Sequence, residues 1–349
     1  MKQKQILSAV VITLATLLLL VAPGSAAARG PLVIDGGGQR AIEQALKQAR
    51  PGDTIRVKAG TYDNGNPLEP LVIRVAGEAD APITLVGEGR PRLGTVLIYR
   101  SRHFRLEGFE IAHQQSPRFF VGIEVRHSEA ITLRRLKIHH LSASAIGASG
   151  EGENLLIEQS EFYELAPPRS GQDAHCFVNS SVKNVTFRAN DCHGFIGDGY
   201  HAYVTGSTER FDRGRTVIEG NRITNTKGVC SENAVDIKGE QEGEIILRDN
   251  DFAGFREMQA GQCRVHATGC GYCQVLTFHQ GSTGRLLIEN NRFRDSDNGL
   301  RNDGMRASVR YNSFKDIHHF VVYDRSRDSV YARNQFERVA ELSHPKSNY

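Results

Sequence analysis

Apolar and polar residues alternate in short runs along most of the chain, and one pattern returns many times. Residues 157–165 read IEQSEFYEL, and the shared order is apolar, polar, any, Asn, polar, apolar. Later copies are FRANDCHGF, IEGNRITNT, LRDNDFAGF, IENNRFRDS, VRYNSFKDI and YARNQFERV, and weaker earlier copies are LEGFEIAHQ and LRRLKIHHL. Neighbouring copies lie 21 to 41 residues apart. This spacing, with strand-like alternation and no helical period, predicts a repeat array built of β-strands.

The spaced leucines of leucine-rich repeats are missing, which leaves a parallel β-helix. The sequence therefore predicts an all-β fold, a single-stranded right-handed parallel β-helix (a solenoid) in which each coil adds short strands to long parallel sheets. Steps of 30, 31 and 41 residues between copies exceed a minimal coil, so loops are expected there. The longest step carries CRVHATGCGYC, and a loop of that length is expected to be functional or cross-linked.

The Asn of the repeat is expected to be structural. Stacked at one corner of the coils, these Asn side chains can form a ladder of hydrogen bonds. Asn also tolerates the left-handed backbone conformation, which suits such a bend. The apolar residue two places further on is expected to stack inside the coil. The ladder positions are Asn190, Asn221, Asn250, Asn291, Asn312 and Asn334, and Phe252, Phe293 and Phe314 are examples of the stacked residues.

The segment before the repeats differs from them. Apolar residues recur at helical spacing at Ile42, Ala45, Leu46 and Ala49, before Pro51 and Gly52. This predicts a short amphipathic helix over about 39–50, followed by a strand at 54–58. A helix here would cover the open apolar end of the stack, as solenoids require.

The first 28 residues have the features of a secretory signal peptide: a short cationic start, an apolar run and small residues, with cleavage expected near Ala26 to Ala28. An uncleaved anchor is the alternative. We expect residues 29–349 to form a single domain that is periplasmic or secreted, free of the membrane after cleavage, and monomeric. Loss of Lys2 and Lys4 lowers the net charge from +3 to +1, which gives no electrostatic case for nucleic acid.

Six cysteines lie after the signal segment: Cys176, Cys192, Cys230, Cys263, Cys270 and Cys273. An even number in an exported chain indicates disulfides, whose pairing the sequence does not fix. The spacing of Cys263, His266, Cys270 and Cys273 leaves zinc binding as an alternative.

Equal distances before the ladder Asn should place residues one above another. Lys238 lies twelve residues before Asn250, and His279 lies twelve before Asn291. The two should therefore stand on neighbouring coils, with backbones about 4.8 Å apart. Asp236 and Thr277 are expected to stack likewise and, with Lys238 and His279, to point outward, because the alternating apolar residues point inward.

Other polar residues are expected on the same face. On the coil before, GDGYHAYV places His201 and Tyr203 outward, and the coil after carries Arg301 and Asn302. A solvated lysine beside a histidine is the alternative to a catalytic site, since the exposed faces of solenoids are polar. Titratable groups clustered on several successive coils favour the site.

AIEQALKQARPGDTIRVKAGTYDNG and the following LVIRVAGEADAPITLVGEGRP resemble the start of polysaccharide lyase family six, the family of chondroitinase B and alginate lyases, within the pectate-lyase-like superfamily. AVDIKG and LTFHQGSTGRLLIENNRF are similar to the family's lysine strand and its following strand. The resemblance implies that Lys238 is the base of a β-elimination and that calcium is bound. The positions of the family's two calcium-binding carboxylates are occupied here by Asn233 and Ser231. The acids close to them, Glu232 and Asp236, are therefore the candidate metal ligands.

β-Elimination from a uronate needs a cation at the carboxylate, a base for the C5 proton and an acid for the leaving oxygen. Lys238 or His279 is the candidate base, although Asp236 opposes a neutral lysine. His201 or Tyr203 is the second proton-transfer group, and Arg301 and Asn302 are the substrate-binding candidates. We expect an exported lyase acting on an acidic, uronate-containing polysaccharide. A non-catalytic carbohydrate-binding or surface-interaction β-helix and a uronate C5-epimerase are the alternatives.

Overall fold

A computed structural model describes residues 30, 32–66, 68–113, 121–165, 173–203, 211–225, 229, 231–239, 241–257, 273–279 and 284–347. The chain divides into two units, Met1–Gly30 and Pro31–Tyr349, and the account below concerns the second. The predicted signal peptide lies outside the described residues. Within the described residues, no helix has the length and apolar character needed to cross a membrane.

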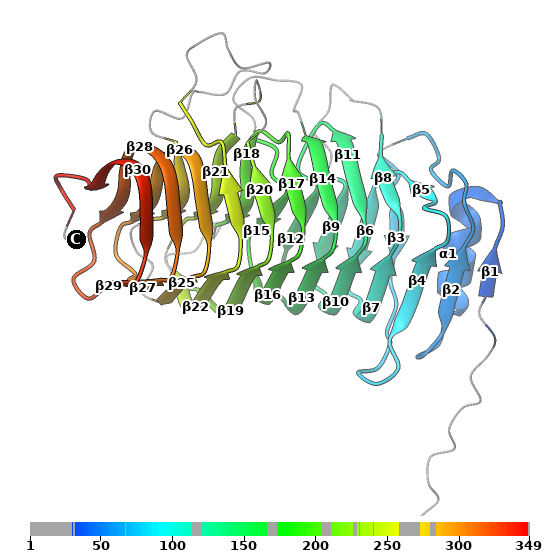
Figure 1. The fold of residues 1–349 in the computed structure, drawn as a ribbon. Coiled ribbons are helices and arrows are strands. Elements are labelled where there is room, and N and C mark those ends of the chain that lie inside the picture. Colours follow the sequence, from blue (N-terminus) through cyan, green and yellow to red (C-terminus); the bar gives the residue numbers. More distant parts are fainter. Residues whose placement is uncertain are drawn as a thin grey trace, which may run out of the picture. The chain divides into compact units, whose positions relative to one another are not determined.

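The predicted N-terminal helix is present as α1 (Gly38–Gln48), which buries Ile42, Ala45 and Leu46. It contacts β1, β2 and β3 at the blue end of the coils in Figure 1. The helix ends about two residues earlier than predicted, because Ala49 is already extended and Arg50 precedes Pro51, where helical backbone is disfavoured.

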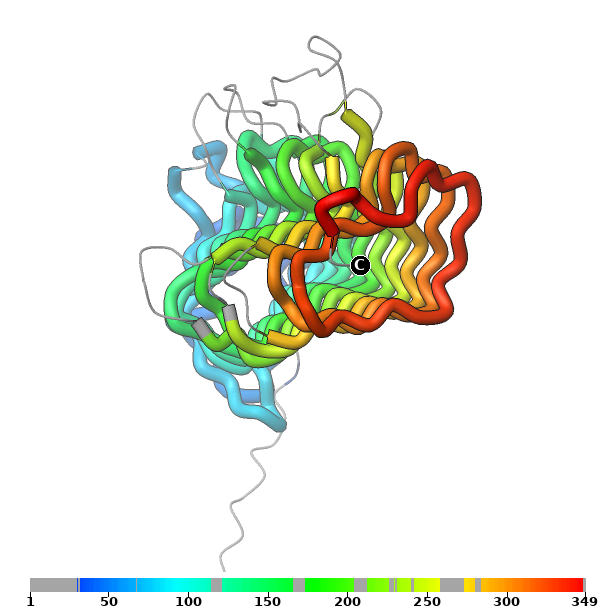
Figure 2. The backbone as a smooth tube through the Cα atoms, turned by 90° about the vertical axis from the view of Figure 1, so that its left-hand side faces the viewer, coloured from blue at the N-terminus to red at the C-terminus, as the bar shows by residue number. Residues whose placement is uncertain are grey.

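The coils build two parallel sheets in the described part of the chain, which confirms the predicted β-helix. Figure 2 shows the successive coils following the same path, one behind another. The 12-stranded sheet runs in the order β1 (Leu32–Ile34), β2 (Thr54–Val57), β4 (Ile83–Gly87), β7 (Arg102–Glu107), β10 (Glu129–Arg134), β13 (Gly152–Glu158), β16 (Val182–Arg188), β19 (Phe211–Glu219), β22 (Gln241–Arg248), β25 (Arg285–Glu289), β27 (Arg306–Arg310) and β29 (Val330–Ala332).

The 18-stranded sheet contains two parallel series that merge toward the C-terminal end (Figure 1). One series is β5 (Arg92–Leu93), β8 (Glu110–Ala112), β11 (Lys137–Leu141), β14 (Glu161–Leu165), β17 (Asp191–His193), β20 (Arg222–Thr224) and β23 (Asp251–Ala253). The other is β3 (Leu71–Ile73), β6 (Val96–Tyr99), β9 (Ile123–Arg126), β12 (Ile146–Ser149), β15 (Phe177–Asn179), β18 (Gly197–Ala202), β21 (Ser231–Ile237) and β24 (Gln274–Phe278). The long strands β26 (Arg292–Asn302), β28 (Ser313–Asp324) and β30 (Gln335–Ser343) complete both series.

The asparagine ladder is confirmed. The Asn250 amide donates to the Asn291 side chain at 2.8 Å and to the carbonyl of Ile218 at 2.8 Å, and its oxygen accepts from the Asn221 backbone at 3.0 Å. The same contacts repeat from Asn190 to Asn334. Each rung therefore joins one coil to the next through buried amide groups.

The left-handed bend occurs one residue earlier than predicted. Positive φ angles occur at Ala189, Asp249, Asn290 and Tyr311, each directly before a ladder Asn, and the ladder residues are not among the left-handed positions. The preceding residue makes the corner, so the Asn keeps an ordinary backbone conformation and turns its amide along the stack. The stacked phenylalanines are confirmed, with the rings of Phe293 and Phe314 4.5 Å apart.

Cysteine pairing is partly defined. Cys176 and Cys192 form a disulfide, and both are fully buried. Cys273 is also disulfide-bonded, which removes it as a thiolate ligand from the predicted zinc alternative. Cys230, Cys263 and Cys270 lie outside the described residues.

Candidate active site

Three polar side chains follow directly on three neighbouring strands. Tyr203 follows β18, Lys238 follows β21 and His279 follows β24. The backbone ladder continues there: the N–H of Lys238 donates to the carbonyl of Ala202 at 2.7 Å, and that of His279 donates to Ile237 at 3.0 Å. The prediction that Lys238 and His279 lie side by side on neighbouring coils is confirmed. Tyr203 stands in the same column one coil earlier, and we call these three residues the outer column.

Asp236 lies beneath the outer column. Its side chain is 2% exposed, and its carboxylate lies 3.0 Å from the Lys238 ammonium and 2.9 Å from Nε2 of His279. Asp236 pairs in register with Thr277, as predicted, and with His201 on the other side. A buried carboxylate needs cationic or donating neighbours. Asp236 therefore fixes Lys238 and His279 at the rim of the same site.

The charge state of Lys238 differs from the one a base needs. Burial lowers the pKa of Lys238, but contact with Asp236, and more distant attraction by Asp198 and Glu232, outweigh burial and raise that pKa above its usual value. Lys238 therefore carries an ammonium group at neutral pH. This charge state favours a cationic role for Lys238 over the base role, and the catalytic role of Lys238 stays a prediction.

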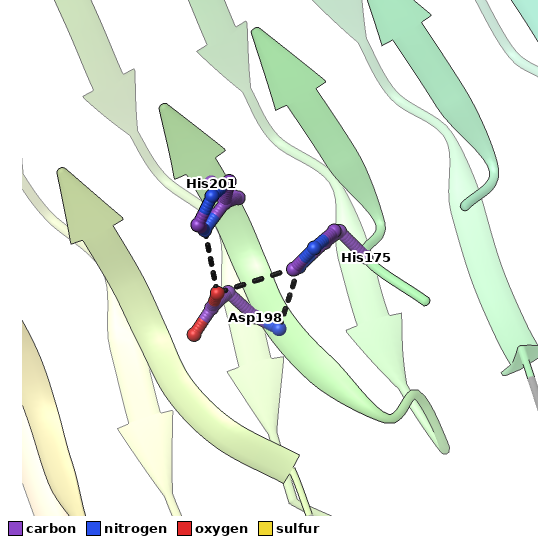
Figure 3. Close-up of side chains that lie close together, drawn as sticks. All are labelled: His175, Asp198 and His201. Atoms are coloured by element: carbon purple, nitrogen blue, oxygen red, sulfur yellow. Dashed lines mark hydrogen bonds and ion pairs between the residues drawn. The ribbon is translucent and has the colours of Figure 1, made fainter. Parts of the chain in front are cut away.

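A second polar group lies next to Asp236. Nδ1 of His201 is 2.7 Å from Oδ2 of Asp198, and Nδ1 of His175 is 3.4 Å from the same oxygen (Figure 3). His175 also accepts a hydrogen bond from the backbone N–H of Asp198 at 2.9 Å. The two imidazole rings stack 4.4 Å apart. We call His175, Asp198 and His201 the His–Asp–His cluster.

The local sequence explains why the cluster forms. His175 precedes Cys176, whose disulfide to Cys192 anchors this segment to the coil interior. Gly197 has a φ of 107°, and a Cβ at that position would lie 3.0 Å from the His175 ring. Only glycine combines that backbone angle with so close an approach. Gly197 thereby lets Asp198 and His175 come together.

Asp198 remains ionised although it is fully buried. Burial alone would raise its pKa, but hydrogen bonds and attraction from His175 and His201 hold the pKa of Asp198 well below its usual range. The Asn233 amide donates to the other carboxylate oxygen at 2.8 Å. The cluster is thus organised around a desolvated negative charge.

Among the described residues, the His–Asp–His cluster is the group in which three side chains that can bind a metal lie close together. The predicted metal ligands Asp236 and Glu232 do not belong to it. Burial, followed by repulsion from Asp198 and Asp173, raises the pKa of Glu232 to about 7. A carboxyl group with this pKa is about half protonated at pH 7, and it would have to lose its proton to bind calcium. Ser231, at one of the family's carboxylate positions, donates its hydroxyl to the carbonyl of Phe195 at 2.7 Å. Calcium binding at Asp236 and Glu232 stays a prediction.

Of the two substrate-binding candidates, Arg301 is partly exposed and Asn302 is not. Arg301 pairs in register with Thr277, so it continues the row that contains Asp236, and its guanidinium contacts Asp303 at 2.7 Å. Asn302 is fully buried, and its amide donates to Met305 at 2.7 Å. The prediction that Asn302 binds substrate is therefore wrong. The side chains alternate along β26, and Asn302 is on the inward side, where it caps the following turn.

A cleft of about 260 Å³ opens beside the cluster, and its lining includes His175, His201, Tyr203, Asp173 and Glu124. A larger cleft of about 720 Å³ is lined by Arg100, Arg102, His127, Glu129, Glu153 and Lys183. None of the predicted site residues lines the larger cleft. Of the predicted site residues, His201 and Tyr203 line the smaller cleft, and Lys238 and His279 do not.

The sequence analysis identified His201 but missed His175 and Asp198. The stretch GDGYHA contains a usable signal, because Asp198 lies three residues before His201 and is flanked by Gly197 and Gly199, which allow irregular backbone. His175 had no such signal, since its position opposite Asp198 depends on the coil path.

No protein-family model and no curated protein sequence matches the chain. Solved structures do match it. The alginate lyase from Paenibacillus sp. str. FPU-7 has a TM-score of 0.59 and 17% identity, and the match covers 91% of this chain and 99% of that one. Pectate lyase Pel9A has a TM-score of 0.55 and 14% identity, covering 87% and 72%. PfbA, a surface adhesin of Streptococcus pneumoniae, has a TM-score of 0.51 and 11% identity, covering 90% and 93%.

At these identities the likeness concerns the fold, and a fold alone does not assign an activity. Membership of polysaccharide lyase family six stays a prediction. The chain shares its β-helix with polysaccharide lyases that include an alginate lyase and a pectate lyase, and also with an adhesin.

Proposed function

We propose that the protein is an exported polysaccharide lyase that cleaves a uronate-containing polysaccharide by β-elimination at the outer column. The observation that carries the proposal is the placement of Lys238 and His279 on adjacent coils, both in contact with Asp236 and both partly exposed, at 43% and 33% of their side chains. The β-helix shared with alginate and pectate lyases supports the same reaction class. Export is supported by the buried disulfide and by the signal-like first 28 residues.

His279 is the proposed base. Nε2 faces Asp236, so a neutral imidazole with its proton on Nε2 keeps the lone pair on Nδ1 for the substrate. A carboxylate beside a histidine base is a recurrent arrangement in catalysis.

Lys238 is the proposed cation. Its ammonium, held by Asp236, would neutralise the C6 carboxylate of the uronate and stabilise the charge that builds up when the C5 proton leaves. Arg301, in the row beneath, is the proposed second contact for a substrate carboxylate.

The proton balance assigns a role to Tyr203. His279 takes the C5 proton, the C5–H electron pair forms the C4–C5 double bond, and the C4–O4 bond breaks with its electrons leaving on O4. Tyr203 follows the strand next to the one that Lys238 follows, and its hydroxyl is the proposed donor of the proton that O4 takes up. Tyr203 also borders the cleft and contacts the His201 ring, with centroids 5.4 Å apart.

The test is incubation of the purified protein with alginate, pectate and chondroitin while the ultraviolet absorbance of a new C4–C5 double bond is followed. We expect absorbance with at least one polymer. His279→Gln should lower kcat by about 10²–10⁴-fold, and Lys238→Met should lower kcat/KM by about 10²–10³-fold. His193→Gln and Lys183→Met, outside the outer column, are the matched controls and should keep wild-type rates.

Full activity in both His279→Gln and Lys238→Met would contradict the proposal that the outer column is the active site. Binding of the polymers without double-bond formation would favour a carbohydrate-binding module. A changed uronate composition without chain cleavage would favour an epimerase.

A further inference from the structure

The His–Asp–His cluster holds a buried carboxylate between two imidazole rings. Asp198 is 0% exposed, and a desolvated carboxylate requires a cation or several donors to remain ionised. Its carboxylate accepts a hydrogen bond from the Asn233 amide at 2.8 Å and lies 2.7 Å from Nδ1 of His201 and 3.4 Å from Nδ1 of His175. Three potential metal-ligating side chains therefore lie together in a buried position beside the small cleft.

The geometry of the three side chains suits one small ion. One ligand atom from each residue lies within 4.8 Å of the other two. Ligands of a tetrahedral zinc ion at about 2.0–2.1 Å are about 3.3 Å from one another. The 3.4 Å between Nδ1 of His175 and Asp198 is close to that spacing. An ion would replace the 2.7 Å hydrogen bond between His201 and Asp198 and the hydrogen bond that Nδ1 of His175 accepts from the Asp198 backbone, and the stacked rings would turn toward it.

The donor set also selects the class of ion. Two imidazole nitrogens and one carboxylate oxygen suit divalent transition metals, whereas calcium prefers six to eight oxygen ligands. Asn233 donates to the outer oxygen of Asp198 at 2.8 Å, which orients the carboxylate so that Oδ2 faces both rings. Such outer contacts are typical of metal sites.

We propose that His175, Asp198 and His201 bind a divalent transition-metal ion of the zinc type, with an open coordination position toward the small cleft. Three protein ligands and one open position characterise catalytic zinc sites, and the cleft of about 260 Å³ is lined by both histidines of the cluster. The ion would add positive charge to a cleft that is bordered by Asp173 and Glu124. The proposal does not depend on the lyase reaction, because metal binding can be measured without a polysaccharide.

The test uses the full chain without a histidine tag, freed of metal with a chelator and then titrated with Co²⁺ or Zn²⁺. We expect one ion per chain and a visible absorption band from bound Co²⁺. Asp198→Asn and His201→Gln should each weaken binding by at least about 100-fold. His193→Gln, a histidine of β17 outside the cluster, should bind like the wild type, and far-ultraviolet circular dichroism checks that each variant is folded.

X-ray absorption of the wild-type Zn²⁺ complex gives a second measurement that needs no variant. Two imidazoles and oxygen ligands at about 2.0–2.1 Å are expected. A sulfur shell would assign the ion to the cysteines and overturn the proposal, as would a shell of oxygens alone. Absence of uptake at millimolar Co²⁺, or unchanged binding in both cluster variants, would overturn it too.

Discussion

Glu232→Gln is predicted to stabilise the protein at alkaline pH and to leave its stability at acid pH unchanged. The pKa of Glu232 is raised from 4.5 to about 7, first by burial and then by repulsion from Asp198 and Asp173. Below pH 4.5 the carboxyl group is protonated in both the folded and the unfolded chain. Between pH 4.5 and 7 the unfolded chain releases the proton while the folded chain keeps it, so stability falls as the pH rises.

The pKa difference sets the size of the effect. A tenfold change in proton affinity corresponds to about 1.4 kcal/mol, so a rise from 4.5 to about 7 amounts to roughly 3 kcal/mol. Glu232 is partly exposed, and screening by solvent reduces this to about 2 kcal/mol. Above pH 7 the penalty is complete, and glutamine, which carries no charge, avoids it.

Urea unfolding at pH 4, 6 and 8, with a chelator present to exclude metal ions, measures the free energy of unfolding of wild type and variant. Glu153→Gln, at an exposed position of the interior strand β13 of the 12-stranded sheet, is the control and should show no such pH-dependent gain. Equal stability of Glu232→Gln and wild type at pH 8, or a gain confined to pH 4, would refute the reasoning.

Two further changes test the ladder and the ion pair. Asn250→Ala leaves the buried N–H of Asn221 and carbonyl of Ile218 without their hydrogen bonds, and it should lower the free energy of unfolding by about 3 kcal/mol. Asn334→Ala, at the partly exposed end of the ladder, should lower it by about 1 kcal/mol. Equal losses for the two variants in urea unfolding would contradict this prediction. Asp236→Asn removes the group that raises the pKa of Lys238, so the alkaline limb of the pH profile of kcat/KM should move to lower pH, and an unmoved limb would argue against a cationic role.

The fold could be predicted because each copy of the sequence repeat corresponds to one coil of the β-helix. Each ladder Asn makes the same contacts with the next coil, and each Phe two residues later stacks on its equivalent, so the sequence has to repeat where the structure repeats. The position of the left-handed bend was missed because it falls on residues of no common type, such as Ala189, Asp249 and Tyr311. The surrounding ladder imposes that conformation, and intrinsic preference does not indicate it.

The site could be predicted only where the coils have equal lengths. Asp236 and Thr277 both lie fourteen residues before their ladder Asn, and the structure pairs them. Arg301 pairs with Thr277 but lies eleven residues before its Asn, and His201 pairs with Asp236 but lies twenty before. Counting from the ladder therefore fails on both flanking coils. For the same reason, the alignment of His175 with Asp198 could not be read from the sequence.

Measurements of metal and activity together separate the two proposals. Asp198, Asp236 and Glu232 form an acidic layer beneath Lys238 and His279, and a polyanionic substrate approaching this layer needs local positive charge. If the ion supplies that charge, chelation should raise KM for an acidic polymer and weaken its binding, while Lys238→Met still takes up Co²⁺. If the ion only organises the cluster, chelation should lower the melting temperature and leave KM unchanged. Full lyase activity without metal would mean that the reaction takes place at the outer column and that the ion has a structural role.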